Sequence, residues 1–155
     1  MEAPHAAETS HEFLTFRLGA EEYAIDILQV REIRAYEAPT RIANTPTYVK
    51  GVVNLRGAIV PILDLRGRFG LGELAAGASR VVVILSLEGR PLGIVVDAVS
   101  DVVRLQAGDI RPAPEQIRAV VSDAFVRGLV PVGDRMLIVV DLARVVAVEA
   151  YVEVA

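Results

Sequence analysis

The sequence predicts a mainly β protein built from two small antiparallel barrels that are related by an internal repeat. Three observations predict this fold class. Val (25 residues) and Ile (11) together outnumber Leu (15), and β-branched residues favour strands. Ten short segments have the pattern of strands, with no long helix between them to connect parallel neighbours. The two halves of the chain also share a pattern. With 155 residues, 53% of them hydrophobic, the chain can bury a core.

Each copy begins with a hairpin. Residues 13–18 alternate between apolar and polar side chains, residues 19–22 are typical of a turn, and alternation resumes at Tyr23. In the second copy an apolar run over 81–87 is followed by a turn over 88–90. Three further strands follow each hairpin. The ten expected strands lie near 13–18, 22–27, 30–36, 50–55, 58–63, 81–87, 91–96, 101–105, 126–132 and 136–140. Closing such short strands into barrels would remove exposed edges.

Short helices and loops complete the expected fold. Asp64 and Asp141 each end a strand and have the position of a helix N-cap. We expect a short helix after Asp64 and a longer C-terminal helix over 142–154. Residues 70–80 are rich in Gly and Ala and are typical of a flexible connection. Residues 1–12 are polar or small, and we expect a disordered head there.

Constant offsets reveal the repeat. The offset is 69 residues at first and becomes 77 further on, so the second copy has eight more residues in its middle. At offset 69, Leu18, Ile25, Ile27, Val30, Glu32 and Ile33 match Leu87, Ile94, Val96, Val99, Asp101 and Val102. At offset 77, residues 49–53 match 126–130, and Asp64-Leu65 matches Asp141-Leu142. Matched glycine and acidic positions in the same order favour a true duplication over chance.

Composition narrows the classes of partner. The net charge is −4 and the pI is about 5.2, which argues against nucleic acid and anionic membranes as partners. The chain has no Cys, so it has neither disulfides nor thiolate metal sites. No apolar run approaches the ~20 residues of a membrane span, and no secretory signal pattern is present. We expect a cytoplasmic protein without membrane insertion.

Residues suited to catalysis do not form a known pattern. The region predicted to be ordered has no His or Cys, and its serines lie in strands or turns without a partner base. Asp97 and Asp101 are four residues apart, and we interpret them as solvated turn acids rather than an acid–base pair. Glycines over 67–72 lack the strand-to-helix context of a phosphate loop. His5 and His11 are interpreted as tail residues. We therefore expect no enzyme activity and no cofactor or metal.

One turn is a better candidate for function. Residues 51–61 are predicted to form a strand, a turn and a second strand, with Gly57 in a left-handed conformation at the turn. This turn displays Arg56, whose guanidinium can bind a carboxylate through two hydrogen bonds. Glu32 is a second candidate because alternation places it on the surface. We expect Arg56 and Glu32 to lie close enough to interact.

The chain resembles the CheW family of chemotaxis coupling proteins from Phe13 to about Val146. The resemblance is strongest in the Asn-Leu-Arg-Gly turn, residues 54–57, within the apolar frame over 51–66. Further matching segments are 13–16, 22–27, 30–33, Thr45-Pro46, 93–102 and 134–138.

This resemblance implies a fold and a function. The fold is a pair of five-stranded SH3-like barrels. The function is that of a cytoplasmic, non-enzymatic adaptor that joins the cytoplasmic tips of methyl-accepting chemoreceptors to the regulatory domain of the histidine kinase CheA, in membrane-associated receptor arrays. The resemblance also implies that receptor helices lie in a groove between the barrels. We expect the isolated chain to be a monomer.

Family positions that are linked to receptor and partner binding match seven residues of this chain. They are Val30, Glu32, Gly51, Arg56, Gly57, Val81 and Val102. The expected domain organisation is a head over 1–12 and a CheW-like domain over 13–155. Within that domain we expect one lobe over about 19–70 and a second over about 81–140 plus the C-terminal helix. The strand over 13–18 is assigned to neither lobe.

Three alternatives remain open at this stage. The first is a fragment of the kinase or of a fusion with a receiver domain. The short segments before and after the repeat argue against this alternative. The second is a small β-barrel enzyme or ligand-binding protein, which the missing polar constellation disfavours. The third is an oligonucleotide-binding barrel, which the acidic pI and the absence of Trp disfavour.

Overall fold

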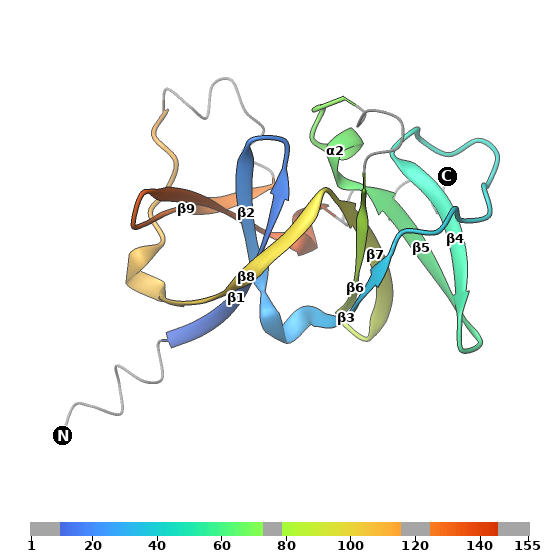
Figure 1. The fold of residues 1–155 in the computed structure, drawn as a ribbon, viewed down its shortest axis with the longest axis horizontal. Coiled ribbons are helices and arrows are strands. Elements are labelled where there is room, and N and C mark those ends of the chain that lie inside the picture. Colours follow the sequence, from blue (N-terminus) through green and yellow to red (C-terminus); the bar gives the residue numbers. More distant parts are fainter. Residues whose placement is uncertain (1–9, 73–78, 116–124, 146–155) are drawn as a thin grey trace. The chain divides into compact units, whose positions relative to one another are not determined.

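The computed structural model describes residues 10–72, 79–115 and 125–145, and it confirms the mainly β fold class (Figure 1). All ten expected strands are present, each with bounds within three residues of those predicted. They are β1 Ser10–Leu18, β2 Glu21–Asp26, β3 Val30–Ala35, β4 Val49–Leu55, β5 Ala58–Asp64, β6 Val81–Leu87, β7 Arg90–Val96, β8 Ala98–Gln106, β9 Val126–Val132 and β10 Arg135–Val140. Two 3-10 turns, η1 Ile27–Gln29 and η2 Ala107–Asp109, and the short helix α2 Leu65–Arg68 connect them.

The strands form two five-stranded sheets with equivalent topologies. One has the order β8-β1-β2-β10-β9 and the other has the order β3-β6-β7-β5-β4. Substituting each strand by its counterpart in the other copy converts one order into the other, which supports the predicted repeat. Most pairs are antiparallel, but β10 pairs with β2 and β5 pairs with β7 in parallel. These parallel pairs correct the prediction of wholly antiparallel barrels. They join strands that are far apart in sequence, so no hairpin fixes their direction.

The structural units interleave the two sequence copies. Unit 1 comprises residues 1–16, 21–27 and 100–155, and unit 2 comprises residues 17–20 and 28–99. The strands β1 and β2 of the first copy therefore belong mainly with β8–β10, whereas β6 and β7 of the second copy belong with β3–β5. This arrangement replaces the expected lobes over 19–70 and 81–140. The two hairpins are counterparts in the repeat and take equivalent places in the two sheets, so each copy contributes its hairpin to the sheet of the other.

The tip of the first hairpin, residues 17–20, belongs to unit 2 and is held there by a hydrogen bond to a largely buried ion pair. The carboxylate of Asp97 accepts hydrogen bonds from the backbone N–H of Gly19 at 2.7 Å and from Arg66 at 2.9 Å. The Arg66 and Asp97 side chains are only 15% and 17% exposed. Asp97 is therefore a structural acid, and the expectation that it is a solvated turn residue was wrong.

The hydrogen-bonded ladders do not close the sheets into barrels, contrary to the prediction. The sheet of unit 2 ends at β3 and β4, and that of unit 1 ends at β8 and β9. Instead, connecting segments cover one edge of each sheet. Thr40 and Val52 exchange two backbone hydrogen bonds of 2.9 Å, and Arg111 pairs with Leu129 in the same way at 2.9 and 2.7 Å. We expected closed barrels because closure protects the edges of a sheet. These bridges protect the edge strands β4 and β9 instead.

Glycine allows these bridging segments to approach the strands. A Cβ atom at Gly51, where φ is +139°, would overlap the carbonyl oxygen of Thr40. At Gly128, its counterpart at offset 77, a Cβ atom would lie 2.6 Å from the carbonyl oxygen of Arg111. The two matched glycines therefore have one structural role, which is close backbone contact.

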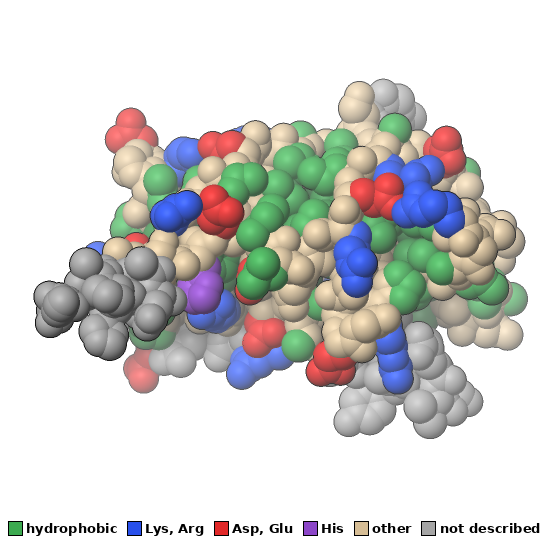
Figure 2. All heavy atoms as spheres, turned by 90° about the horizontal axis from the view of Figure 1, so that it is seen from below, with side chains coloured by type: hydrophobic (Ala, Val, Ile, Leu, Met, Phe, Trp, Pro, Cys, Tyr) green, Lys and Arg blue, Asp and Glu red, His purple; other side chains and the backbone are tan. Residues whose placement is uncertain are grey.

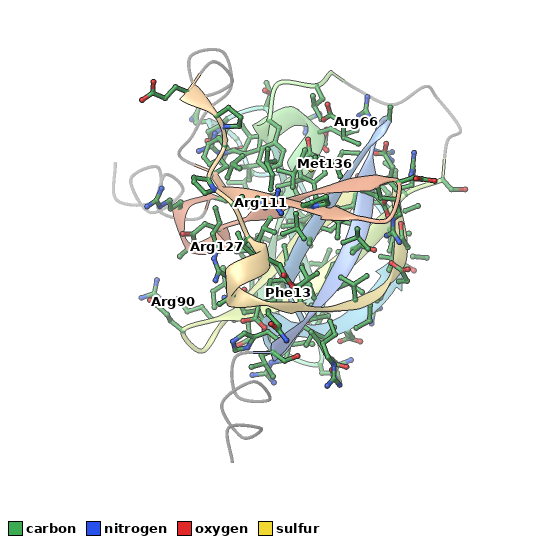
Figure 3. All side chains as sticks on the ribbon, turned by 90° about the vertical axis from the view of Figure 1, so that its left-hand side faces the viewer. Phe13, Arg66, Arg90, Arg111, Arg127 and Met136 are labelled. Carbon is green, nitrogen blue, oxygen red and sulfur yellow. The ribbon has the colours of Figure 1, made fainter. Side chains whose placement is uncertain are left out.

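Each unit has its own hydrophobic core. In unit 1, Phe13 and Leu137 are almost fully buried among residues of β1, β2, β8, β9 and β10. Figure 3 shows Phe13 on β1 and Met136 on β10, whose side chain is exposed. In unit 2, Val60, Ile62, Val82, Ile84 and Val95 form a corresponding cluster from β5, β6 and β7. Strand β3 alternates between half-buried and exposed positions, whereas β6 and β7 contain runs of four and five consecutive buried residues, as expected for continuous apolar segments.

The predicted helix starts are partly confirmed. Asp64 precedes α2, but its side chain makes no capping hydrogen bond. Asp141 accepts a hydrogen bond from the backbone N–H of Ala143 at 3.1 Å, as an N-cap does. Residues 142–145 are helical, and the remainder of the expected C-terminal helix lies outside the described residues. The same holds for residues 1–9 of the head, whereas residues 10–12 belong to β1.

The described part of the chain contains no helix that is long and apolar enough to cross a membrane.

Candidate partner-binding site

The β4–β5 turn displays Arg56 on a tight two-residue loop. Leu55 pairs with Ala58, and the two residues between them have positive φ angles, 51° at Arg56 and 92° at Gly57. Positive φ at both positions is the geometry of a type I′ turn, which matches the twist of a hairpin. The amide oxygen of Asn54 accepts a hydrogen bond from the Gly57 N–H at 2.8 Å. The left-handed conformation predicted for Gly57 is confirmed, and the Asn-Leu-Arg-Gly motif is explained by this turn.

Arg56 and Glu32 form an ion pair, as the sequence predicted. The Nη2 atom of Arg56 lies 2.5 Å from Oε2 of Glu32, and Nη1 of Arg34 lies 3.5 Å from Oε1 of the same carboxylate. The Arg56 side chain is 72% exposed, whereas that of Glu32 is 29% exposed. Glu32 therefore anchors the guanidinium from β3, and most of the Arg56 surface stays accessible.

The arginine at the turn keeps Glu32 ionised. The hydrogen bond from Arg56 lowers the pKa of the Glu32 carboxyl below its ordinary value of 4.5. A depressed folded-state pKa means that the pair contributes to stability above pH 4.5 and that this contribution is lost as the pH falls through the lowered pKa.

Removing the arginine should raise the pKa of Glu32. In an Arg56→Ala variant we expect the Glu32 carboxyl to titrate closer to 4.5, because its main hydrogen-bond donor is gone. An NMR titration of the side-chain carboxyl carbon measures this directly. An unchanged pKa in the variant would mean that the ion pair does not persist in solution.

The other predicted site residues occupy different environments. Val30 is half-buried in β3 opposite Leu85, and Val81 is half-buried at the start of β6. Gly51 is buried in β4. Val102 lies on β8, and its residue is 50% exposed. Unit 2 contains six of the seven predicted site residues, and unit 1 contains Val102. The structure brings Glu32 and Arg56 into direct contact.

Exposed large hydrophobic residues occur at repeat-equivalent positions in the two units. Ile33 on β3 is 47% exposed, and its counterpart at offset 69 is Val102 on β8, at 50%. Ile59 on β5 is 70% exposed, and its counterpart at offset 77 is Met136 on β10, at 54%. Figure 2 shows hydrophobic side chains at the surface among acidic and basic ones. Exposed apolar residues rimmed by charge are typical of protein-binding surfaces.

Unit 1 has an acid–arginine pair related to that of unit 2. Asp101, the counterpart of Glu32, lies 3.3 Å from Nη2 of Arg135. Arg135 also binds both carboxylate oxygens of Glu22, at 2.9 and 2.8 Å. Thr15, fully buried, donates a 2.6 Å hydrogen bond to Asp101 and so lowers the pKa of that carboxyl. This network joins β1, β2, β8 and β10, so its role is to hold the sheet together.

An Arg135→Ala variant should be less stable than an Arg56→Ala variant. It would leave the Glu22 carboxylate, which is 11% exposed, without its bidentate partner, and such a loss costs about 1–3 kcal/mol. Urea denaturation of both variants measures the difference. Equal free energies of unfolding for the two variants would contradict the assignment of Arg135 to structure.

The sequence did not predict two neighbours of the candidate site. Arg34 is two residues from Glu32 on the same face of β3, so strand alternation was the signal that could have found it. Ile59 lies in the apolar segment of β5, and its residue type does not distinguish an exposed position beside the turn from the buried positions further along the strand. The described residues contain no group of three or more acidic or His side chains placed to hold a metal ion.

Comparison with known proteins adds further findings. Residues 12–150 match the family model described as the CheW-like domain. The chain is 51% identical to the chemotaxis protein CheW of Klebsiella aerogenes over 93% of this chain and 87% of that protein. It is 36% identical to the chemotaxis protein CheW of Rhizobium meliloti over 92% of each chain. The crystal structure of the scaffolding protein TtCheW from Thermoanaerobacter tengcongensis superposes with a TM-score of 0.77 at 33% identity. That superposition covers 84% of this chain and 88% of the crystallised one.

Proposed function

Because the chain belongs to the CheW-like family of chemotaxis proteins, we propose that it is a cytoplasmic, non-enzymatic adaptor between chemoreceptors and a histidine kinase. Its partners would be the cytoplasmic tips of methyl-accepting receptors and the regulatory domain of a CheA-type kinase. The chain would be recruited to membrane-associated receptor arrays through the receptors.

One observation carries this proposal. Each unit exposes large hydrophobic residues at equivalent places, Ile33 and Ile59 in unit 2 and Val102 and Met136 in unit 1. An adaptor must hold two partners at once, and it therefore needs two separate surfaces. Exposed apolar residues in both units would supply a contact for each partner, and joining two weak contacts in one chain raises the overall affinity.

Recognition would combine apolar contact with charge. A receptor helix that presents an apolar stripe would cover Ile59, which pairs with Asn54 beside the β4–β5 turn, in a common mode of helix recognition. Arg56, exposed at the adjacent turn, would bind an acidic side chain of the partner and set the register of the helix. Charges at the rim of an interface contribute to specificity and association rate more than to affinity.

Affinity capture from the source cell tests the proposal. The tagged chain is incubated with a membrane-containing lysate, and bound proteins are identified by mass spectrometry. We expect a CheA-type kinase and chemoreceptors in the captured fraction, and a double variant with Ile59→Ser and Met136→Ser should capture both less efficiently. Capture of neither partner, or equal capture by the double variant, would contradict the proposed adaptor role.

A further inference from the structure

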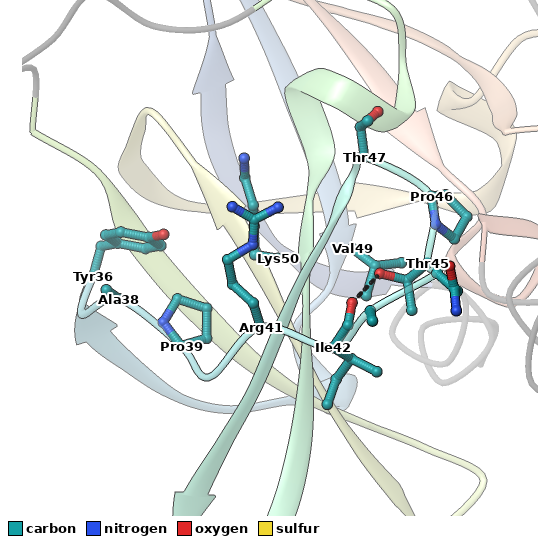
Figure 4. A pocket seen from close by; sticks show the side chains of 12 residues that line it. Tyr36, Ala38, Pro39, Arg41, Ile42, Thr45, Pro46, Thr47, Val49 and Lys50 are labelled. Atoms are coloured by element: carbon teal, nitrogen blue, oxygen red, sulfur yellow. Dashed lines mark hydrogen bonds between the residues drawn. The ribbon is translucent and has the colours of Figure 1, made fainter.

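A cavity of about 760 Å³ is formed by the segment that connects β3 to β4 and by the first residues of β4 (Figure 4). Cavities of this volume are within the range of small-molecule sites. The proposed function does not use it, because the residues around it differ from the exposed positions on β3 and β5. Its lining consists of Tyr36, Ala38, Pro39, Arg41, Ile42, Ala43, Asn44, Thr45, Pro46, Thr47, Val49 and Lys50.

The lining is positively charged, although the protein is acidic. The chain has 20 acidic and 16 basic residues, yet Arg41 and Lys50 are the charged residues of the lining, and neither Asp nor Glu contributes to it. Figure 4 shows the two side chains extending in the same direction from the connecting segment and from β4. Glu37, which lies in this segment, lines a separate cavity of about 70 Å³. An anion could therefore approach both cations without meeting a carboxylate in the lining.

The charge of Lys50 is only loosely balanced. Its Nζ atom lies 3.9 Å from Oδ2 of Asp64, at the outer limit of an ion pair, and Asp64 is buried. Arg41 is exposed. A second arginine, Arg80, stacks on the ring of Tyr36 with 4.3 Å between the guanidinium carbon and the ring centroid. Arg41 and Lys50 make the lining of the cavity positively charged, which favours an anionic ligand.

The walls of the cavity are held in place before any ligand binds. Thr40 is fixed to Val52 by two backbone hydrogen bonds, and the Val49 N–H donates to the carbonyl of Pro46 at 3.0 Å. The hydroxyl of Thr45 donates to the carbonyl of Ile42 at 3.0 Å, which closes the loop between them (Figure 4). A preorganised site binds its ligand with a smaller loss of conformational entropy.

The lining also offers an apolar surface. Ile42 is 47% exposed, and Pro39, Val49 and the ring of Tyr36 contribute further apolar area to the same cavity. Charged groups and apolar walls in one cavity match a ligand that has an anionic group on an apolar body.

We propose that this cavity is a binding site for a small organic anion, whose carboxylate or phosphate lies between Arg41 and Lys50 and whose apolar body lies against Ile42 and Tyr36. Carboxylate and phosphate share the chemistry that arginine and lysine recognise. The site lies apart from the Arg56 turn, so occupancy and partner binding can be measured separately.

An NMR titration of the full-length, 15N-labelled protein at fixed ionic strength tests this site. The probes are phenyl phosphate, benzoate, inorganic phosphate and the neutral analogue benzyl alcohol. We expect saturable shifts at the amides of residues 36–50 with phenyl phosphate or benzoate, and weaker binding of inorganic phosphate and benzyl alcohol. The two organic anions distinguish a phosphate ligand from a carboxylate ligand. Absence of saturation with both of them, or equal binding of benzyl alcohol, would overturn the proposal.

Three variants identify the cations responsible. Arg41→Ala and Lys50→Gln should each weaken binding of the preferred organic anion roughly tenfold, because each removes a charge-assisted hydrogen bond. Arg90→Ala removes an exposed arginine of the same unit outside the cavity, and it should leave the dissociation constant unchanged. Unchanged binding in both cavity variants, or equal weakening in all three, would reject the site. Folding of each variant is checked by its amide spectrum.

Discussion

Reversing the charge of Arg56 should leave the protein folded and should weaken its binding to receptor and kinase by 10-fold or more. Arg56 is 72% exposed, so its removal disturbs little packing. At an interface, however, placing like charges together costs several kcal/mol. Arg56→Glu and Glu32→Lys are each compared with wild type for melting temperature, for binding to purified receptor signalling fragments and to the kinase, and for receptor-stimulated kinase activity.

A matched control exists in the same unit. Arg90 is exposed beside the β6–β7 turn, in which Glu88 and Gly89 have positive φ angles as Arg56 and Gly57 do. Arg90→Glu carries the same change in charge and should keep wild-type binding. Folded Arg56→Glu and Glu32→Lys variants that keep wild-type binding and kinase stimulation would refute the role of this site in partner contact.

The double variant Arg56→Glu with Glu32→Lys separates two explanations for a loss of binding. Exchanging the charges can restore the internal ion pair, but it places an acid at the exposed turn. If Arg56 contacts the partner directly, binding remains weak in the double variant. Full recovery of binding would show that the internal ion pair, rather than a contact of Arg56 with the partner, supports function.

Gly51→Ala should cost about 2–6 kcal/mol of folding stability. The added methyl group would overlap the carbonyl of Thr40, and φ of +139° is unfavourable for any residue with a Cβ. Overpacking costs about 1–3 kcal/mol and a strained backbone position adds a similar amount. Gly128→Ala meets the backbone of Arg111 at 2.6 Å, without a positive φ, and should cost less than Gly51→Ala.

Guanidinium denaturation measures these free energies, with Gly108→Ala as the control. No heavy atom lies within 4 Å of a Cβ atom at Gly108, and its φ is not in the left-handed region. That variant should stay within about 0.5 kcal/mol of wild type. A Gly51→Ala variant as stable as the control would contradict the close contact between the connecting segment and β4.

The role of Gly51 also affects how binding data are interpreted. The resemblance to the CheW family links this position to partner binding, but Gly51 is buried and has no side chain to offer a partner. Substitution there would displace Thr40, which lies in the segment that forms the cavity wall. A loss of partner binding in a Gly51 variant should therefore accompany a loss of stability, in contrast to Arg56→Glu.

Strand positions were predictable because local sequence determines them. Alternation and turn residues located all ten strands, and Gly57 located the left-handed turn. Which hairpin joins which sheet was not predictable, because the two hairpins are counterparts in the repeat and take equivalent places in the two sheets. Because each hairpin joins the sheet of the other copy, β2 pairs in parallel with β10 and Asp97 binds the tip of the first hairpin. Local sequence patterns do not indicate either contact.

The candidate site was predictable in part for the same reason. Residue type and turn geometry identified Arg56, and alternation identified Glu32. Two additional features required three-dimensional information. The first is the second arginine, Arg34, at 3.5 Å from Glu32. The second is the different environment of two related acid–arginine pairs. Asp101–Arg135 is combined with Glu22 in a four-strand network, whereas Glu32–Arg56 leaves its arginine exposed.

Reconstitution of receptor control over the kinase tests the adaptor role most directly. Purified kinase and receptor signalling domains in nanodiscs are mixed with and without this chain, and kinase autophosphorylation is measured. We expect stimulation by the receptor to require the chain, to persist with Arg90→Glu and to fall at least tenfold with Arg56→Glu. Receptor-stimulated activity that is the same without the chain, or no complex of the three components with the wild-type chain, would contradict the adaptor role.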